Sequence, residues 1–262
     1  MSNKIWGVIL VLSLVIAGVS GYNVIKLSSE YRTGIEEYAA LEEYVVVEET
    51  QVEEEPAVKE EEVVVEKESQ IPVLVDVRYE VLESINDDFV SWLYYEPLEI
   101  SYPVVRGNDN DYYTSYTFEG TKNSSGAIFM DFLNKPDYSN YNTIIYGHNM
   151  RNGTMFGSLK KLLNDESLIT GDPYFYVFTE DKSYMYEIFA VYVTKASSQT
   201  YDLIKDEAGQ EEYLDYIDGV ATWLSDKEVK ASDKIVTLST CHGLHSNNRT
   251  VVHGVLIAEE DR

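Results

Sequence analysis

The chain has 262 residues, with 20 Lys and Arg against 46 Asp and Glu, which gives a formal net charge of −26. So much negative charge argues against nucleic-acid binding and against docking on anionic lipid through a basic patch, because both need clustered Lys and Arg. Cys241 is the only cysteine, so an intramolecular disulfide is impossible and a cysteine-based zinc site is not expected. The 44% hydrophobic fraction is enough for a folded core, and the length suits one domain with appendages.

An uncharged apolar segment covers residues 5–25 and is bracketed by Lys4 and Lys26. At about 1.5 Å per residue, this segment spans roughly 30 Å, the thickness of the hydrocarbon core of a bilayer. We expect a single transmembrane signal-anchor, and the alternative is a signal peptide cut near the small residues at 17–21. The short basic flank predicts that residues 1–4 are cytoplasmic and that the body of the chain is outside the cell.

Residues 26–70 are predicted to form an acidic, Glu- and Val-rich extracellular linker. Residues 30–68 contain 15 Glu against Arg32, Lys59 and Lys67. Such a composition favours a solvated, self-repelling spacer, which would hold a domain well away from the membrane. The alternative is that the Val–Glu runs bind a partner.

The folded domain is expected at residues 71–262. Apolar residues at a spacing of three to four predict a helix over residues 78–95. Helices are also predicted at residues 155–163 and 206–224, and the second of these has one apolar face. Short β-like runs are separated by Gly, Asn and Asp and predict a mainly β fold, either a closed barrel or a sandwich. These runs cover residues 100–105, 127–132, 143–146, 174–178, 184–194, 234–238 and 250–258.

Three residues with catalytic chemistry stand at predicted strand ends. Cys241 follows one strand, Arg249 begins the next, and His148 follows the strand at residues 143–146. A thiolate is a nucleophile, an imidazole can donate and accept a proton, and a guanidinium can donate hydrogen bonds to a developing oxyanion. If they converge on one cleft, these groups indicate acyl transfer. The alternative for a lone cysteine is a small buried hydrophobic residue.

The four histidines differ in their positions along the chain. His242 and His245 follow Cys241 directly and are therefore near it by sequence alone. His253 lies in the middle of an apolar strand, where we expect it to be packed. Spacing alone does not decide between His148 and His242 as the acid–base residue.

Several sequence motifs follow one another in the second half of the chain. Residues 237–241 read T-L-S-T-C, and Arg249 is followed by V-V-H-G at residues 251–254. Residues 146–150 read Y-G-H-N-M, with M-F-G at residues 155–157. These motifs are preceded by Y-P-V-V at 102–105, N-D-Y-Y at 110–113 and G-A-I-F-M-D at 126–131. From about residue 86 to residue 257, the chain resembles a class B sortase, a cysteine transpeptidase of Gram-positive cell surfaces.

The resemblance implies a sortase-type eight-stranded β-barrel with N-terminal helices and a long helix inserted before the cysteine strand. It implies that Cys241 is the nucleophile, that His148 is the general acid and base, and that Arg249 orients the substrate and stabilises the transition state. No metal or cofactor is implied. Gly243 replaces an Asp of some class B members, so no acidic helper is carried over to this chain. The positions that line the substrate groove in the family map onto Asn110, Thr114, Tyr146 and Ser239.

The function implied by the resemblance is anchoring of proteins to the cell wall. A secreted protein with a C-terminal sorting signal, N-P-x-T followed by Asn, Gly or Ser, would be cleaved after Thr through an enzyme thioester. A peptidoglycan amine would then accept the protein, at the outer face of a single-pass membrane enzyme. The alternatives are a pilin-polymerising sortase with a Lys acceptor, a cysteine protease with water as acceptor, and a non-catalytic surface domain that binds peptides.

Overall fold

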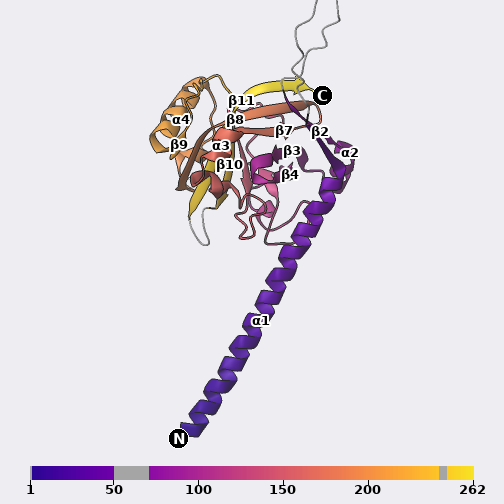
Figure 1. Cartoon of the computed structure of the whole chain (residues 1–262), viewed down its shortest axis with the longest axis vertical. Coiled ribbons are helices and arrows are strands. Elements are labelled where there is room, and N and C mark those ends of the chain that lie inside the picture. Colours follow the sequence, from indigo (N-terminus) through magenta and orange to yellow (C-terminus); the bar gives the residue numbers. More distant parts are fainter. Residues whose placement is uncertain (1, 50–70, 242–246) are drawn as a thin grey trace, which may run out of the picture.

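The computed structural model describes residues 2–49, 71–241 and 247–262 (Figure 1). Its helices are α1 (Ser2–Leu41), α2 (Tyr79–Ile85), α3 (Ser167–Gly171) and α4 (Glu207–Val220). Its strands are β1 (Val45–Glu49), β2 (Val73–Val77), β3 (Phe89–Tyr95), β4 (Ile100–Val105), β5 (Ile128–Met130), β6 (Asn142–Gly147), β7 (Tyr174–Phe178), β8 (Lys182–Lys195), β9 (Trp223–Leu224), β10 (Ile235–Cys241) and β11 (Asn248–Asp261). Short 3-10 turns lie at Glu42–Tyr44, Glu96–Leu98, Tyr112–Thr114, Leu159–Leu163 and Gln199–Tyr201.

Eight of the described strands close into a barrel. Their order is β11-β10-β6-β5-β4-β3-β7-β8, and β8 pairs back onto β11. This closing ladder is antiparallel and contains register shifts after His253 and Leu256, where bulges help long strands to curve. The mainly β, eight-stranded barrel predicted from the sequence is therefore confirmed. The short strand β9 adds to β8 outside the ring.

The barrel strands are covered on both faces. Large side chains such as Trp92, Tyr95 and Phe175 are fully buried, and each such burial contributes about 1.5–3 kcal/mol. Helix α4 packs Tyr213 and Ile217 of its apolar face against β8 and β11. This helix precedes the cysteine strand, as predicted, although the interval 206–224 divides into α4 and β9.

The helix predicted over residues 78–95 is wrong in its second half. Helix α2 ends at Ile85, and residues Phe89–Tyr95 form β3. Strand β3 pairs with β4 and β7 and is almost entirely buried. It therefore shows no polar alternation, and a run of this kind cannot be told from a buried helix by periodicity. The interval 155–163 is likewise helical only over Leu159–Leu163, as a 3-10 turn.

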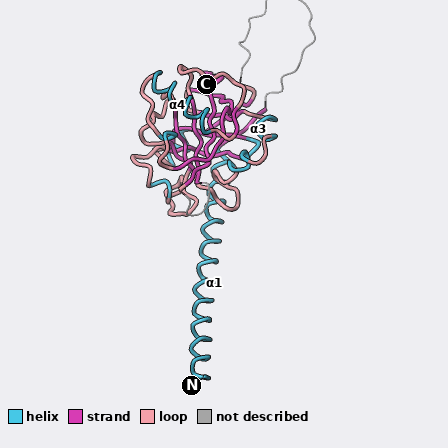
Figure 2. The backbone as a smooth tube through the Cα atoms, turned by 90° about the vertical axis from the view of Figure 1, so that its left-hand side faces the viewer, coloured by secondary structure: helices cyan, strands magenta, loops and turns pink. Residues whose placement is uncertain are grey.

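Helix α1 extends well beyond the apolar segment at residues 5–25. Figure 2 shows it projecting from the barrel as one rod. Among the described residues, it is the one helix long and apolar enough to cross a membrane. Its last turns bury Glu37, Tyr38 and Leu41 against the domain. The spacing of three to four residues places these side chains on one face of α1, and this face packs against the domain. The neighbouring glutamates of the sequence are exposed.

The part of the predicted linker that the structure describes is ordered secondary structure. After α1, strand β1 pairs antiparallel with β2, and Glu49 lies opposite Val73. Residues 26–49 therefore form the end of α1, a 3-10 turn and a paired strand. The remainder of the predicted linker, residues 50–70, lies outside the described residues.

Candidate active site

A cavity of about 460 Å³ lies where β6 and β10 end. These two strands are parallel, with Ser239 opposite Tyr146 and Thr240 opposite Gly147. Because the carboxyl ends of parallel strands meet at one edge of a sheet, residues that follow them lie close together. The cavity is lined by six of the residues singled out from the sequence: Asn110, Thr114, Tyr146, His148, Ser239 and Arg249.

Cys241 is the last residue of β10. Its backbone pairs with that of Arg249 on the antiparallel strand β11, and Thr240 beside it lines the cavity. Directly opposed residues of an antiparallel pair have Cα atoms about 4.5–5.5 Å apart. The fold therefore brings Cys241, Arg249 and His148 to the same end of the barrel. His242 and His245 lie outside the described residues.

The imidazole of His148 is held by the backbone of a neighbouring loop. Its Nε2 lies 2.6 Å from the carbonyl oxygen of Thr114. A carbonyl oxygen only accepts hydrogen bonds, so Nε2 carries the proton of this bond. Nδ1 is then the nitrogen that can exchange a proton with a reactant. His253, in contrast, is completely buried, as expected, and bonds to Thr237 and Tyr192.

One wall of the cavity is organised by the carboxylate of Asp131. It accepts hydrogen bonds from the Tyr146 hydroxyl at 2.9 Å and from the Asn110 side-chain amide at 2.8 Å. The Asn110 carbonyl oxygen in turn accepts the backbone N–H of Phe132 at 3.0 Å. Burial, helped by the nearby carboxylate, raises the pKa of Tyr146 above its ordinary range. The phenol therefore stays a neutral donor, and both predicted groove residues have fixed orientations.

Tyr201 is a cavity residue that sequence reasoning missed. Its hydroxyl lies 2.8 Å from the Ser239 hydroxyl, and its ring stacks on Tyr146 with centroids 6.1 Å apart. It stands in a 3-10 turn between β8 and α4, where no motif marks it. Asp131 was also missed as a site residue, although it ends the G-A-I-F-M-D motif at residues 126–131 and so carried a usable signal.

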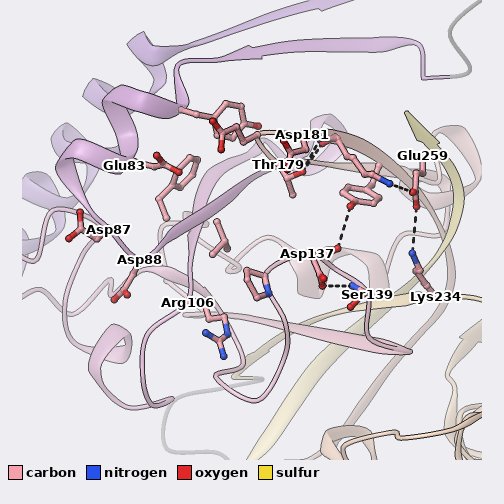
Figure 3. Close-up of a pocket in the computed structure, with 17 residues that line it drawn as sticks. Glu83, Asp87, Asp88, Arg106, Asp137, Ser139, Thr179, Asp181, Lys234 and Glu259 are labelled. Atoms are coloured by element: carbon pink, nitrogen blue, oxygen red, sulfur yellow. Dashed lines mark hydrogen bonds and ion pairs between the residues drawn. The ribbon is translucent and has the colours of Figure 1, made fainter. Parts of the chain in front are cut away.

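A second cavity, of about 730 Å³, lies between α2, the turn between β7 and β8, and the segment 136–139 (Figure 3). Carboxylates such as Glu83, Asp137 and Asp181 line it, together with an ion pair of Lys182 and Glu259. It contains none of the residues predicted for the site. Among the described residues, no group of His, Cys, Asp and Glu side chains is arranged to hold a metal ion. The smaller cavity is therefore the candidate active site, since an imidazole and a guanidinium line it next to the cysteine strand.

Comparison with known families agrees with this geometry. A family model described as the sortase domain matches residues 93–257. The matched segment includes His148, Cys241, Arg249 and the strands that carry them. The chain belongs to the sortase family of cysteine transpeptidases.

Its relatives place it in class B, as the sequence predicts. Sortase B of Listeria monocytogenes is 35% identical over 189 residues, which cover 70% of this chain and 76% of the relative. Sortase B of Staphylococcus aureus is 33% identical over 171 residues, covering 64% and 69%. The crystal structure of sortase B from B. anthracis in complex with AAEK1 has a TM-score of 0.69 at 31% identity and covers 87% of this chain and 98% of that chain. A Staphylococcus aureus sortase B–substrate complex has a TM-score of 0.64 at 31% identity and covers 68% and 84%.

Proposed function

We propose that this sortase is a membrane-anchored surface enzyme that joins secreted proteins to a peptidoglycan amine. Its substrate is a C-terminal sorting signal of the form N-P-x-T followed by Asn, Gly or Ser, cleaved after Thr. The observation that carries the proposal is the single cavity lined by His148 and Arg249 at the strand end where Cys241 pairs with Arg249. Family membership supplies the reaction class, and a relative has been solved as a substrate complex.

In the first half-reaction, the Cys241 thiolate attacks the carbonyl carbon of the Thr residue. The carbonyl π electrons move to oxygen, and the Arg249 guanidinium donates hydrogen bonds to this oxyanion. When the intermediate collapses, the C–N bond breaks, and the leaving amine takes a proton from the His148 imidazolium. The products are a thioester on Cys241, a neutral imidazole and the released C-terminal peptide.

In the second half-reaction, a peptidoglycan amine attacks the thioester carbonyl. The neutral imidazole of His148 takes one proton from the amine, the C–S bond breaks, and the thiolate is restored. Because Nε2 of His148 is bonded to Thr114, we assign both proton transfers to Nδ1. The new bond is an amide, so the substrate protein ends covalently attached to the wall.

The groove that recognises the peptide is proposed to run over Asn110, Thr114, Tyr146 and Ser239. All four line the cavity. Asp131 fixes Asn110 and Tyr146, as described above, so this wall meets the peptide with little reorganisation. Preorganisation of this kind improves binding because fewer side chains must be immobilised when the ligand arrives.

The proposed topology has residues 1–4 in the cytoplasm, residues 5–25 in the membrane and the barrel outside the cell. The support is the apolar first half of α1 and its emergence from the barrel as a continuous helix. The substrate class also fits this placement, since sorting signals are delivered at the membrane surface.

The test uses the full chain in lipid nanodiscs with a quenched fluorescent library of sorting-type peptides. Each peptide is incubated with no acceptor, with an oligoglycine or stem-peptide amine, or with a pilin-type Lys peptide. Variants Cys241→Ala, His148→Asn and Arg249→Lys are measured beside the unaltered chain. Arg249→Lys keeps the positive charge but loses the bidentate donor geometry of the guanidinium.

We expect cleavage that depends on Cys241 and a product that carries the peptidoglycan-type amine. Preferential capture of the Lys peptide would instead support pilin assembly. Release of the hydrolysed peptide in every condition would indicate a protease. Full activity of Cys241→Ala would refute the nucleophile assignment.

A further inference from the structure

The loop that holds His148 contacts one edge of the imidazole at two points. The carbonyl oxygen of Thr114 lies 2.6 Å from its Nε2. At the other end of the loop, a Cβ added to Gly126 would lie 3.0 Å from His148 Cδ2, so the loop backbone lies directly against the ring. Gly126 has a φ of +58°. The position of the catalytic imidazole therefore depends on the path of this loop.

Helix α1 holds the same loop at Gly126. The buried hydroxyl of Tyr38 donates a hydrogen bond of 2.8 Å to the Gly126 carbonyl oxygen. The Tyr38 ring packs edge-on against Tyr102, with centroids 5.4 Å apart. Because Tyr38 is only 7% exposed, this bond lies in a dry environment, where hydrogen bonds are strong and directional.

Glu37, the next residue of α1, holds the middle of the loop. Its carboxylate accepts the Thr117 hydroxyl at 2.8 Å and the Glu119 backbone N–H at 3.0 Å. About two turns earlier, the backbone carbonyl of Glu30 accepts the Asn123 side-chain amide at 2.8 Å. The helix therefore contacts the loop through hydrogen bonds spread over two turns.

The burial of Glu37 is unusual for a contact that serves only stability. Glu37 as a residue is 9% exposed, and desolvation raises the pKa of its carboxyl in spite of the two hydrogen bonds. Apolar side chains would dock the helix with less desolvation cost. A buried carboxylate with two defined donors instead fixes the register and rotation of α1 on the loop.

We propose that α1 positions the imidazole of His148, with Tyr38 and Glu37 as positioning residues that act through the loop from Thr114 to Gly126. This inference rests on the proposed role of His148. In this proposal, the helix that emerges from the membrane also helps to set the rate of acyl transfer, because it positions the catalytic imidazole.

The test compares Tyr38→Phe with Tyr31→Phe in the full chain in nanodiscs. Tyr38→Phe removes the hydroxyl that bonds Gly126 and keeps the ring. Tyr31 lies two turns earlier on α1 and packs partly buried against the same core, so Tyr31→Phe is the matched control. Glu37→Gln is the second variant, since it removes the charge and keeps the size.

The first readout is the His148 signal in spectra of the chain labelled with ¹⁵N at histidine, assigned by its loss in His148→Asn. The second is the pH profile of kcat and KM for the best sorting peptide. We expect Tyr38→Phe and Glu37→Gln to shift the His148 resonances and the titration midpoint. We also expect kcat to fall about threefold to tenfold with little change in KM, because small displacements of a reacting group are costly. Tyr31→Phe should change neither readout.

The proposal is overturned if Tyr38→Phe and Glu37→Gln give His148 spectra and pH profiles identical to those of Tyr31→Phe, whatever happens to the melting temperature. A lowered melting temperature with an unchanged imidazole signal would mean that α1 is only a structural support. The spectra read His148 directly. The positioning is therefore tested even if the unaltered chain fails to transfer peptides, an outcome that would reject the proposed function alone.

Discussion

Replacing Gly126 by Ala perturbs the active-site loop in two separable ways. The φ of +58° is a left-handed conformation that costs about 1–2 kcal/mol for a residue with a Cβ. The new Cβ would also lie 2.5 Å from the backbone oxygen of Tyr113. A backbone atom cannot move aside by changing rotamer, and overpacking of this kind costs about 1–3 kcal/mol more. The expected total destabilisation is about 2–5 kcal/mol.

Gly153→Ala provides the matched control for this prediction. Gly153 has a φ of +86° and no atom within 4 Å of an added Cβ. Gly153→Ala is therefore destabilised by the left-handed backbone conformation and not by overpacking. The two variants should therefore differ by the overpacking cost, which for a domain of this size corresponds to roughly 2–12 °C in Tm. Thermal unfolding of both chains, followed by tyrosine and tryptophan fluorescence, measures that difference.

Activity gives a second measure of the same substitution. The Cβ would approach His148 Cδ2 to 3.0 Å, so Gly126→Ala should lower kcat at temperatures where the chain remains folded. Gly153→Ala should retain the unaltered rate. Equal melting temperatures for the two variants would refute the crowding argument. An unaltered kcat for Gly126→Ala would refute the contact between the loop and the imidazole.

Burial lowers the pKa of His253 from 6.5 to about 3, so below pH 6.5 the unfolded chain takes up a proton that the folded chain rejects. The free energy of unfolding should therefore fall as the pH is lowered from 6.5 towards about 3. His253 alone should account for a loss of about 3 kcal/mol at pH 4.5. His253→Gln should flatten this part of a plot of melting temperature against pH. Asp206 caps α4 by accepting the Gly209 N–H at 2.8 Å, so Asp206→Ala should cost about 1 kcal/mol in thermal unfolding and Asp206→Asn much less. Tyr201→Phe removes the bond that orients the Ser239 hydroxyl in the cavity wall. It should raise the KM for a sorting peptide by up to about fivefold, because the free energy of one hydrogen bond is the upper limit of this indirect effect. An unchanged KM in steady-state kinetics would contradict the proposal that Tyr201 shapes the peptide-binding wall.

The strands of the barrel were largely predictable because turn residues separate them. The run at residues 174–178 matches β7 at both ends. Strand β3 was mistaken for a helix because both of its faces are buried, which removes the alternation that identifies a strand. The closure of β8 onto β11 joins segments far apart in the chain, and local patterns carry no signal for such a pairing.

Prediction of the site depended on motifs. Cys241 and Arg249 are separated by one short loop, so their pairing across two strands follows from the sequence. His148 joins them through the parallel pairing of β6 with β10, which no local pattern encodes, and the family resemblance supplied it. Tyr201 reaches the cavity from a turn whose position depends on the packing of α4, and so it could be found only in three dimensions.

The pairing of β1 with β2 changes what determines the reach of the enzyme. Glu49 lies opposite Val73, so β1 is held against β2 within the domain. The distance between the proposed membrane span and the barrel is therefore set by α1. With residues 5–25 in the membrane, as proposed, Tyr38 lies at most about 20 Å along the α1 axis from Ile25. About six extended residues cover that distance. Under the proposed function, the length of α1 between Ile25 and Tyr38 therefore sets the minimum spacer that a substrate delivered at the membrane needs to reach the height of Tyr38.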